Sequence, residues 1–422
     1  MKPNIGDTFQ GRARNLSSDG SAVVETTGKT PDGGLVFFVE GAWPGDEGIF
    51  EVTSLEARYG YAKIQKLNVL SHERVQPPCP YQGHGPGKCG GCPWMMGSYE
   101  AQLKHKEHRV RFALQRAKLL SESNADVFKP IWASPETMSY RNRAQFKTDG
   151  SRLGFVSMST SDMIDIEDCL MLNTKMREHL KQLRSMLPNK KWEPTPPHHW
   201  NFLDLDDEVN LDRDLVLNKR RPFKQGNTVQ NERMKNWVAE KIRHFHKNGA
   251  PILELFCGSG NFTEVITRAS ANTSAVDILA VEASRAALTV LDQKKLSGVR
   301  TLDWNLSSKA DFEKLSRKVN PKTQMMLMDP PREGAKGVEV LLEKVPSIEV
   351  VVSISCDVAT FTRDAAVLSR LGFELTEIQA LDLFSANSSC GNARNSNEIK
   401  IAIKKSVKIQ HLINTHLFTQ KN

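Results

Sequence analysis

Two reactive side chains stand at the ends of short apolar runs in the last third of the chain. Asp329 follows the run from Met325 to Met328, and Cys356 follows an apolar run from Ile348 to Ile354. Such runs predict parallel strands buried on both faces, and open α/β sheets bind ligands at the carboxyl ends of their strands. The pair predicts nucleophilic chemistry with Cys356 as the nucleophile. The alternative, a capping Asp329 and a Cys356 that only packs, fits an arbitrary cysteine better than this pair of positions.

A second pattern upstream predicts a ligand site on the same sheet. A strand beginning near Pro251 runs into Gly258-Ser259-Gly260, and another strand ends at Glu282, 22 positions after Gly260, where a carboxylate accepts from ribose hydroxyls. The lack of a third glycine argues against a pyrophosphate and for an adenosyl ligand such as S-adenosylmethionine (SAM). A third strand from Val299 would bring Asp303 near the adenine. The alternative for each carboxylate is a helix cap or a surface charge.

Three cysteines in the second quarter of the chain are spaced like metal ligands. Cys79 is followed by Cys89-Gly90-Gly91-Cys92, in which the glycines let backbone amides approach the sulfurs. Cys169 is the one remaining cysteine outside the C-terminal region and would be the fourth ligand. The spacing leaves Zn²⁺ and an iron–sulfur cluster open.

Composition narrows the class of protein. A chain of 422 residues predicts two or three domains, and a net charge of +8 favours a polyanionic partner, most simply nucleic acid. No apolar stretch approaches the roughly 20 residues that span a bilayer, and the N-terminus does not resemble a signal peptide. We therefore expect a cytoplasmic monomer, with no membrane partner, whose seven cysteines serve as thiols or metal ligands.

The remaining segments supply elements that would position these groups and bind RNA. Alternating residues between about 4 and 70 predict a small β-barrel, and helices are expected at 99–120 and 231–248. The segment from Ser139 to Phe146 sets aromatic rings beside guanidinium groups, a mixture suited to stacking on splayed bases. The acidic cluster from Asp204 to Glu208 is expected to face solvent.

With these residues in view, the chain resembles the RNA uridine C5-methyltransferases, in the branch that carries a TRAM barrel and a four-cysteine iron–sulfur cluster. The resemblance covers nearly the full length. It rests on the stretches 89–92, 166–169, 223–227, 253–262, 329–332 and 353–360, which read CGGC, IEDC, FKQGN, LELFCGSGNF, DPPR and SISCDVAT.

The resemblance implies an α/β protein of three domains. Residues 1–70 would form an OB-like TRAM barrel that binds RNA, 71–220 a central α+β domain with the cluster, and 221–422 a Rossmann-like SAM-dependent methyltransferase domain. It implies a [4Fe-4S] cluster on Cys79, Cys89, Cys92 and Cys169. It implies SAM bound by Gln225, Glu254, Phe256, Gly258, Gly260, Glu282, Asp303 and Asp329. Cys356 would add to uracil C6, Asp329 would hold the base edge, and Arg332 and Arg363 would favour the thiolate.

The family's last motif is altered in this chain. Glu398 is the best match to the base that removes the C5 proton, but a longer loop separates it from Asp382-Leu383-Phe384, and the usual proline and histidine are missing. Three alternatives follow: a methyltransferase for adenine amino groups, a cytosine C5-methyltransferase, and a non-catalytic RNA-binding or folding protein. Ribosomal RNA, most simply 23S rRNA, is the expected substrate, with transfer RNA as the alternative.

Overall fold

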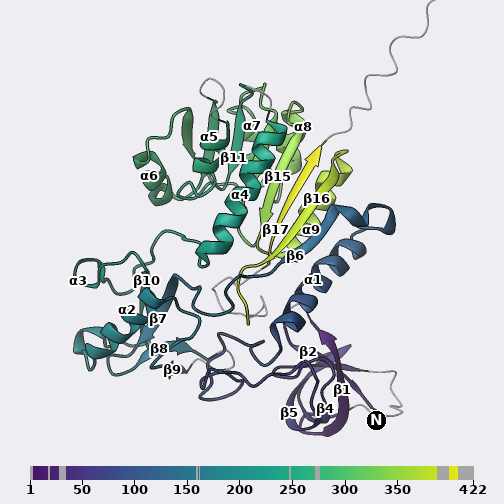
Figure 1. Ribbon diagram of the computed structural model, residues 1–422, viewed down its shortest axis with the longest axis vertical. Coiled ribbons are helices and arrows are strands. Elements are labelled where there is room, and N and C mark those ends of the chain that lie inside the picture. Colours follow the sequence, from purple (N-terminus) through teal and green to yellow (C-terminus); the bar gives the residue numbers. More distant parts are fainter. Residues whose placement is uncertain are drawn as a thin grey trace, which may run out of the picture. The chain divides into compact units, whose positions relative to one another are not determined.

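The computed structural model describes residues 3–17, 20–27, 35–157, 160, 162–246, 249–270, 276–386 and 399–406, the last range by its backbone alone (Figure 1). The chain forms two compact units. Unit 1 comprises residues 1–109, 131–231 and 381–399, and unit 2 comprises residues 110–130, 232–380 and 400–422. The helices α1 (Tyr99–Arg116) and α4 (Thr228–Phe245) each contain a point where the chain passes from one unit to the other. The division into three domains stays a prediction.

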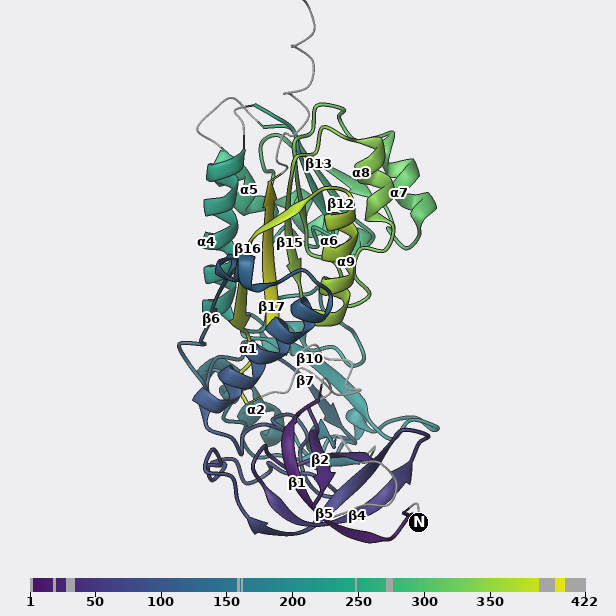
Figure 2. The ribbon, with the colours of Figure 1, turned by 90° about the vertical axis from the view of Figure 1, so that its right-hand side faces the viewer.

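The N-terminal barrel of unit 1 is closed, as the alternating sequence predicted. Its strands are β1 (Thr8–Leu16), β2 (Ala22–Thr26), β3 (Val36–Val39), β4 (Glu47–Leu55) and β5 (Tyr59–Val69), in the order β1-β2-β3-β5-β4. Pairing of β1 with β4 closes the barrel, drawn in purple in Figure 2. Alternate residues such as Val24, Phe37 and Phe50 point inward and are fully buried, since successive side chains of a strand face opposite sides.

Unit 1 also contains an antiparallel four-stranded sheet. Its strands β7 (Arg143–Thr148), β8 (Leu153–Val156), β9 (Met163–Asp165) and β10 (Asn201–Asp206) run in the order β10-β7-β8-β9. Helix α2 (Thr174–Ser185) packs Leu180 and Leu183 into one core with Phe146 of β7. The short helices between and after these strands are η2 (Lys190–Trp192) and α3 (Leu211–Asp214).

An eight-stranded sheet, mostly in unit 2, has the order β13-β12-β11-β14-β15-β17-β16-β6. Its strands are β6 (Phe128–Trp132), β11 (Ile252–Leu255), β12 (Ile278–Glu282), β13 (Val299–Asp303), β14 (Met325–Met328), β15 (Val350–Ser355), β16 (Glu374–Asp382) and β17 (Ile399–Ser406). The strands from β13 to β15 pair in parallel, whereas β17 pairs antiparallel with β15. The strands predicted at 325–328 and 299–303 are confirmed.

Helices follow the parallel strands and cover the sheet. They are α5 (Thr263–Ser270), α6 (Arg285–Gln293), α7 (Lys309–Ser316), α8 (Val338–Lys344) and α9 (Val358–Arg370), and η1 (Glu122–Val127) precedes β6. Figure 2 shows α4 and α8 on opposite sides of the sheet. Phe312 of α7, Leu341 of α8 and Leu368 of α9 share one apolar cluster with alternate residues of β11 and β14. None of the described helices is long and apolar enough to cross a membrane.

Candidate active site

Asp329 and Cys356 follow directly after two neighbouring parallel strands of unit 2. Strands β14 and β15 are in register with Met328 opposite Ser353, so both carboxyl ends reach the same edge of the sheet. The Asp329 amide donates to the Leu255 carbonyl at 3.4 Å, which ties this position to the end of β11. Cys356 is partly exposed, and the next residue, Asp357, caps α9 by accepting from the Thr360 amide at 2.8 Å. The strand-end placement that the sequence predicted for both groups is confirmed.

The loop after Asp329 is fastened to the helix that follows Cys356. The Asp364 carboxylate on α9 accepts from the Ala335 amide at 2.8 Å, and the Arg363 guanidinium donates to the Glu333 carbonyl at 2.7 Å. Arg363 also pairs with Asp364, at 2.7 Å. Gly334 has φ +73°, and a Cβ there would lie 2.3 Å from the Arg363 guanidinium, so only glycine fits. Arg363 therefore positions the loop, and the expectation that it favours the thiolate stays untested.

The turn after β11 presents its backbone to open space. Phe256, Gly258 and Gly260 all have positive φ, and a Cβ on Gly258 would meet nothing within 4 Å. The Gly258 amide donates to the Glu282 carboxylate at 3.0 Å. Strands β12 and β13 pair Glu282 directly with Asp303. This edge of unit 2 thus gathers the glycine turn and both strand-end carboxylates that the sequence assigned to an adenosyl ligand, and its open backbone fits such a ligand.

Glu254 on β11 is the most perturbed carboxyl group of this edge. It is 1% exposed, and within the described residues neither carboxylate oxygen has a hydrogen-bond partner. Burial raises the pKa of Glu254 to about 8, the nearby Thr263 hydroxyl lowers it in part, and the charge of Asp329 adds to the rise. Glu254 is therefore mostly protonated near neutral pH when no cation is bound beside it.

Glu254→Gln is expected to make stability less dependent on pH. The pKa of Glu254 rises from an ordinary 4.5 to about 8 on folding, so the unfolded chain releases the proton first as pH rises. The free energy of unfolding of the wild type should then fall relative to the variant by up to about 1.4 kcal/mol per pH unit between those values. Urea unfolding of the SAM-free proteins between about pH 5 and 8 measures this.

The control for this experiment is Glu343→Gln, which changes an exposed carboxyl group of α8. It should leave the slope of stability against pH as in the wild type. Parallel curves for Glu254→Gln and the wild type would contradict a protonated Glu254.

The four cysteines Cys79, Cys89, Cys92 and Cys169 lie near one another in unit 1. Burial raises the pKa of the Cys89 thiol to about 11, and charges on Cys169 and Cys79 would raise it further. Burial also raises the pKa of the Cys92 and Cys169 thiols. None of the described cysteines forms a disulfide. Among the described residues, no group of three or more His, Cys, Asp or Glu side chains is arranged to hold a metal ion.

The surroundings of these thiols nevertheless fit sulfur ligands. The backbone amide of Gly91 donates to the Cys89 sulfur, and those of Met171 and Leu172 donate to the Cys169 sulfur. The positive charge of Arg141 lowers the pKa of the Cys89, Cys92 and Cys169 thiols, against the larger effect of burial. Amide donors and a nearby cation are what thiolates that ligate a cluster require.

Two expectations about unit 1 are wrong. Tyr140 is 6% exposed and Phe146 is 0% exposed, so neither ring is available to stack on a base. The acidic cluster does not face solvent as a whole, because Asp204 is buried and pairs with Arg143 at 2.7 Å. Phe146 belongs to the inward face of β7, where the alternation of the strand overrides the aromatic and basic composition.

Two predicted site residues are outside this edge of unit 2. Gln225 belongs to unit 1, where its backbone carbonyl accepts from the Asn142 side chain at 2.9 Å. Glu398 lies outside the described residues. It directly precedes β17, in which Ile401 pairs with Ser355, the residue before Cys356. The roles of Gln225 and Glu398 stay predictions.

Sequence reasoning missed a group of residues in unit 1 that surrounds Asp382. Lys106 of α1 is 2% exposed and donates to Asp382 at 2.8 Å. The sequence showed Lys106 only as one cation of a basic helix. Its position four residues after Gln102 and four before Val110, both buried, is the periodic signal that could have placed it on the inner face.

Known proteins resemble both the sequence and the fold. The family model described as tRNA (Uracil-5-)-methyltransferase matches residues 201–388. An RNA methyltransferase of Nitrosomonas europaea is 41% identical over 384 residues, which covers 89% of this chain and 93% of the relative. A 23S rRNA (uracil(1939)-C(5))-methyltransferase of Shewanella woodyi is 26% identical over 406 residues, with 83% and 88% covered.

Among solved structures, the tRNA (uracil-54, C5)-methyltransferase of Pyrococcus abyssi, in complex with S-adenosyl-L-homocysteine, has the same fold. Its TM-score is 0.62 at 18% identity, over 94% of this chain and 100% of that chain. The chain therefore belongs to the RNA uracil C5-methyltransferase family, whose members are SAM-dependent enzymes.

Proposed function

We propose that this chain methylates C5 of a uridine in 23S rRNA through a covalent intermediate on Cys356. The observation that carries the proposal is the strand register that brings Asp329 and Cys356 to one edge of the sheet, beside the glycine turn and Glu282. A nucleophile, a base-binding carboxylate and an adenosyl site are the three parts that the reaction needs at one place.

The chemistry assigns a role to each group. Uracil C5 is too weak a nucleophile to accept a methyl group unaided, so the Cys356 thiolate adds to C6 and makes C5 carbanion-like. Asp329 holds the edge of the base while charge develops on the ring. The C5 carbon then attacks the methyl carbon of SAM, and S-adenosylhomocysteine leaves.

Proton removal completes the cycle. Glu398 takes the C5 proton, the electrons of the C5–H bond form the C5=C6 double bond, and the C6–S bond breaks to return the thiolate. The support for Glu398 is its place in the sequence directly before β17, which pairs with β15. The altered loop before Glu398 makes this the assignment that most needs a test.

SAM binding is proposed for the glycine turn and the strand ends around it. Gly258 and Gly260 leave room above the backbone, and Glu282 and Asp303 would accept from the ribose and the adenine. Glu254, Phe256, Gln225 and Asp329 would complete the site. A cation of SAM near Glu254 would favour its ionised form, in agreement with a carboxyl group that is otherwise kept neutral.

For the rest of the chain, we propose a TRAM barrel in residues 1–70, a central domain in 71–220 and a Rossmann-like methyltransferase domain in 221–422. The central domain would hold a [4Fe-4S] cluster on Cys79, Cys89, Cys92 and Cys169. Four thiols that interact, yet are not gathered for one ion, favour a cluster over Zn²⁺, since a cluster spaces its ligands more widely. The cluster would fix the loops that supply its ligands.

The test uses RNA from a strain that lacks the gene, labelled with tritium at C5 of uridine. Incubation with the protein and SAM should release tritium to water in proportion to 5-methyluridine formed, and mapping should place it in 23S rRNA. Methylated adenosine or 5-methylcytidine without tritium release from uridine would overturn the proposal. Product in tRNA alone would move the substrate to the alternative that the matching family model names.

A further inference from the structure

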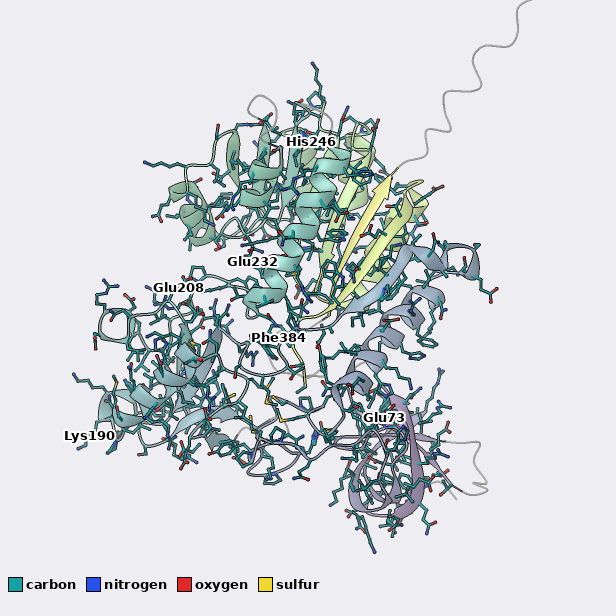
Figure 3. The ribbon with its side chains drawn as sticks, viewed as in Figure 1. Glu73, Lys190, Glu208, Glu232, His246 and Phe384 are labelled. Carbon is teal, nitrogen blue, oxygen red and sulfur yellow. The ribbon has the colours of Figure 1, made fainter. Side chains whose placement is uncertain are left out.

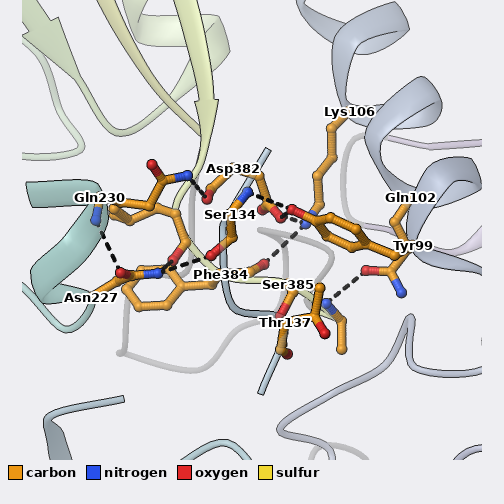
Figure 4. Close-up of polar contacts among 12 residues, drawn as sticks. Tyr99, Gln102, Lys106, Ser134, Thr137, Asn227, Gln230, Asp382, Phe384 and Ser385 are labelled. Atoms are coloured by element: carbon orange, nitrogen blue, oxygen red, sulfur yellow. Dashed lines mark hydrogen bonds and ion pairs between the residues drawn. The ribbon is translucent and has the colours of Figure 1, made fainter. Parts of the chain in front are cut away.

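The irregular segment Asp382–Ala386, here called the arm, is held by side chains at every residue. It follows β16 in unit 1, and Figure 4 shows most of its partners. Side chains donate to four consecutive backbone carbonyls: Gln230 to Asp382 at 2.6 Å, Asn227 to Leu383 at 3.0 Å, Lys106 to Phe384 at 2.9 Å and Tyr140 to Ser385 at 3.3 Å. The Ala386 amide donates to the Gln102 side chain at 2.6 Å. A segment without regular structure is thus as fully bonded as a strand.

A buried ion pair lies at the start of the arm. The Lys106 ammonium donates to one Asp382 carboxylate oxygen at 2.8 Å, and the Tyr99 hydroxyl donates to the other at 2.8 Å. The side chains of Lys106 and Asp382 are 2% and 1% exposed. Burying two charges costs desolvation energy that their attraction often fails to recover, so such a pair is better explained by the geometry it fixes than by stability.

The arm is also bonded to the cysteine-rich loop. The Ala386 carbonyl accepts from the Trp94 amide at 3.0 Å, two residues after Cys92. The Trp94 ring is fully buried and lies 5.9 Å from the Lys106 ammonium. Phe384, labelled in Figure 3, has its ring centroid 6.0 Å from that of Tyr140. The arm therefore has the same rigid neighbours as the proposed cluster ligands.

The arm directly precedes the part of the chain that carries the proposed base. Strand β17 begins at Ile399, one residue after Glu398, and lies between β16 and β15 in the sheet. Cys356, by contrast, is held by β15 and by the cap of α9. The two ends of the reaction thus depend on different supports.

We propose that Lys106 and Asp382 are positioning residues for proton removal from C5, because they fix the arm from which the chain continues to Glu398. The proposal rests on the proposed function, in which Cys356 adds to C6 and Glu398 takes the C5 proton. Loosening the arm slows the last step and leaves thiolate addition and methyl transfer unchanged.

The test compares Lys106→Met with the wild type on two RNAs from a strain that lacks the gene, one with uridine and one with 5-fluorouridine. Fluorine at C5 blocks proton removal, so the fluorinated RNA reports addition and methyl transfer alone. We expect Lys106→Met to form the methylated covalent adduct on this RNA within about twofold of the wild-type rate. On uridine RNA, tritium release should fall by roughly tenfold to a hundredfold, and the same adduct should accumulate.

Matched variants separate positioning from a general loss of packing. Lys241→Met removes another buried lysine, whose side chain is 5% exposed and pairs with Glu377 in unit 2 at 2.9 Å, and should accumulate no adduct. Glu398→Gln should accumulate more adduct than Lys106→Met, and Lys106→Arg should restore part of the release rate. Tyr99→Phe, a milder change at the same carboxylate, should show the pattern to a smaller degree if Lys106→Met does not fold.

Two results would be adverse, and they differ. Equal slowing of adduct formation and tritium release by Lys106→Met and Tyr99→Phe, without accumulation of adduct on uridine RNA, would overturn the positioning role. Absence of any adduct between the wild type and fluorinated RNA would instead overturn the proposed function itself.

Discussion

Replacing Cys356 with alanine is expected to lower the rate of uridine methylation by at least about a thousandfold, because no other group can then activate C5. The same change should abolish the covalent adduct with RNA that contains 5-fluorouridine. Gel electrophoresis under denaturing conditions, with SAM labelled in its methyl group, detects that adduct directly.

The binding of SAM supplies the control for Cys356→Ala. The glycine turn and Glu282 are held by β11 and β12, whereas Cys356 follows β15, so calorimetry should find SAM affinity unchanged within about twofold. Cys356→Ser keeps the size of the side chain with a far weaker nucleophile and should behave like alanine. An adduct formed equally by the wild type and Cys356→Ala would exclude Cys356 as the nucleophile.

The second large effect is expected for Cys92→Ser. Anaerobically purified wild type should contain about four iron and four sulfide per chain, and the variant should contain neither. Because bound metal stabilises the folded state, the variant should lose roughly 3 kcal/mol or more of its free energy of unfolding. Iron and sulfide analysis, followed by urea unfolding without oxygen, measures both effects.

Cys390→Ser is the matched control, since Cys390 is outside the four proposed ligands. Its iron content should equal that of the wild type. One zinc per chain without iron in the wild type would replace the cluster with a zinc site. A metal-free wild type of unchanged stability would leave the four thiols without a ligand role.

The active-site edge was predictable because its information is local. Apolar runs followed by Asp329, by Cys356 and by the glycine turn need only the rule that ligands bind at the carboxyl ends of parallel strands. The strand predicted at 278–282 and the barrel in the first 70 residues are confirmed for the same reason, since periodicity and turn residues are read within a few positions.

What the sequence could not predict depends on contacts between distant segments. Tyr140 and Phe146 look like a base-stacking pair, but β7 turns Phe146 into the core, and Tyr140 is buried against a partner 245 positions away, Ser385. Lys106 and Asp382 are 276 positions apart, so no local pattern pairs them. Composition suggested RNA binding at places where the fold needed a core and a buried charge.

The position of β17 has a consequence for how the chain acquires its structure. This strand is the last described element in sequence, yet it is inserted between β15 and β16, with Ser353 opposite Ile403. During translation, β15 and β16 must wait for residues 399–406 with their pairing edges open. The nucleophile and the proposed base therefore meet only when synthesis is nearly complete. An unfinished chain bears Cys356 without the strand that follows Glu398, and its open edges make it prone to aggregation rather than partly active.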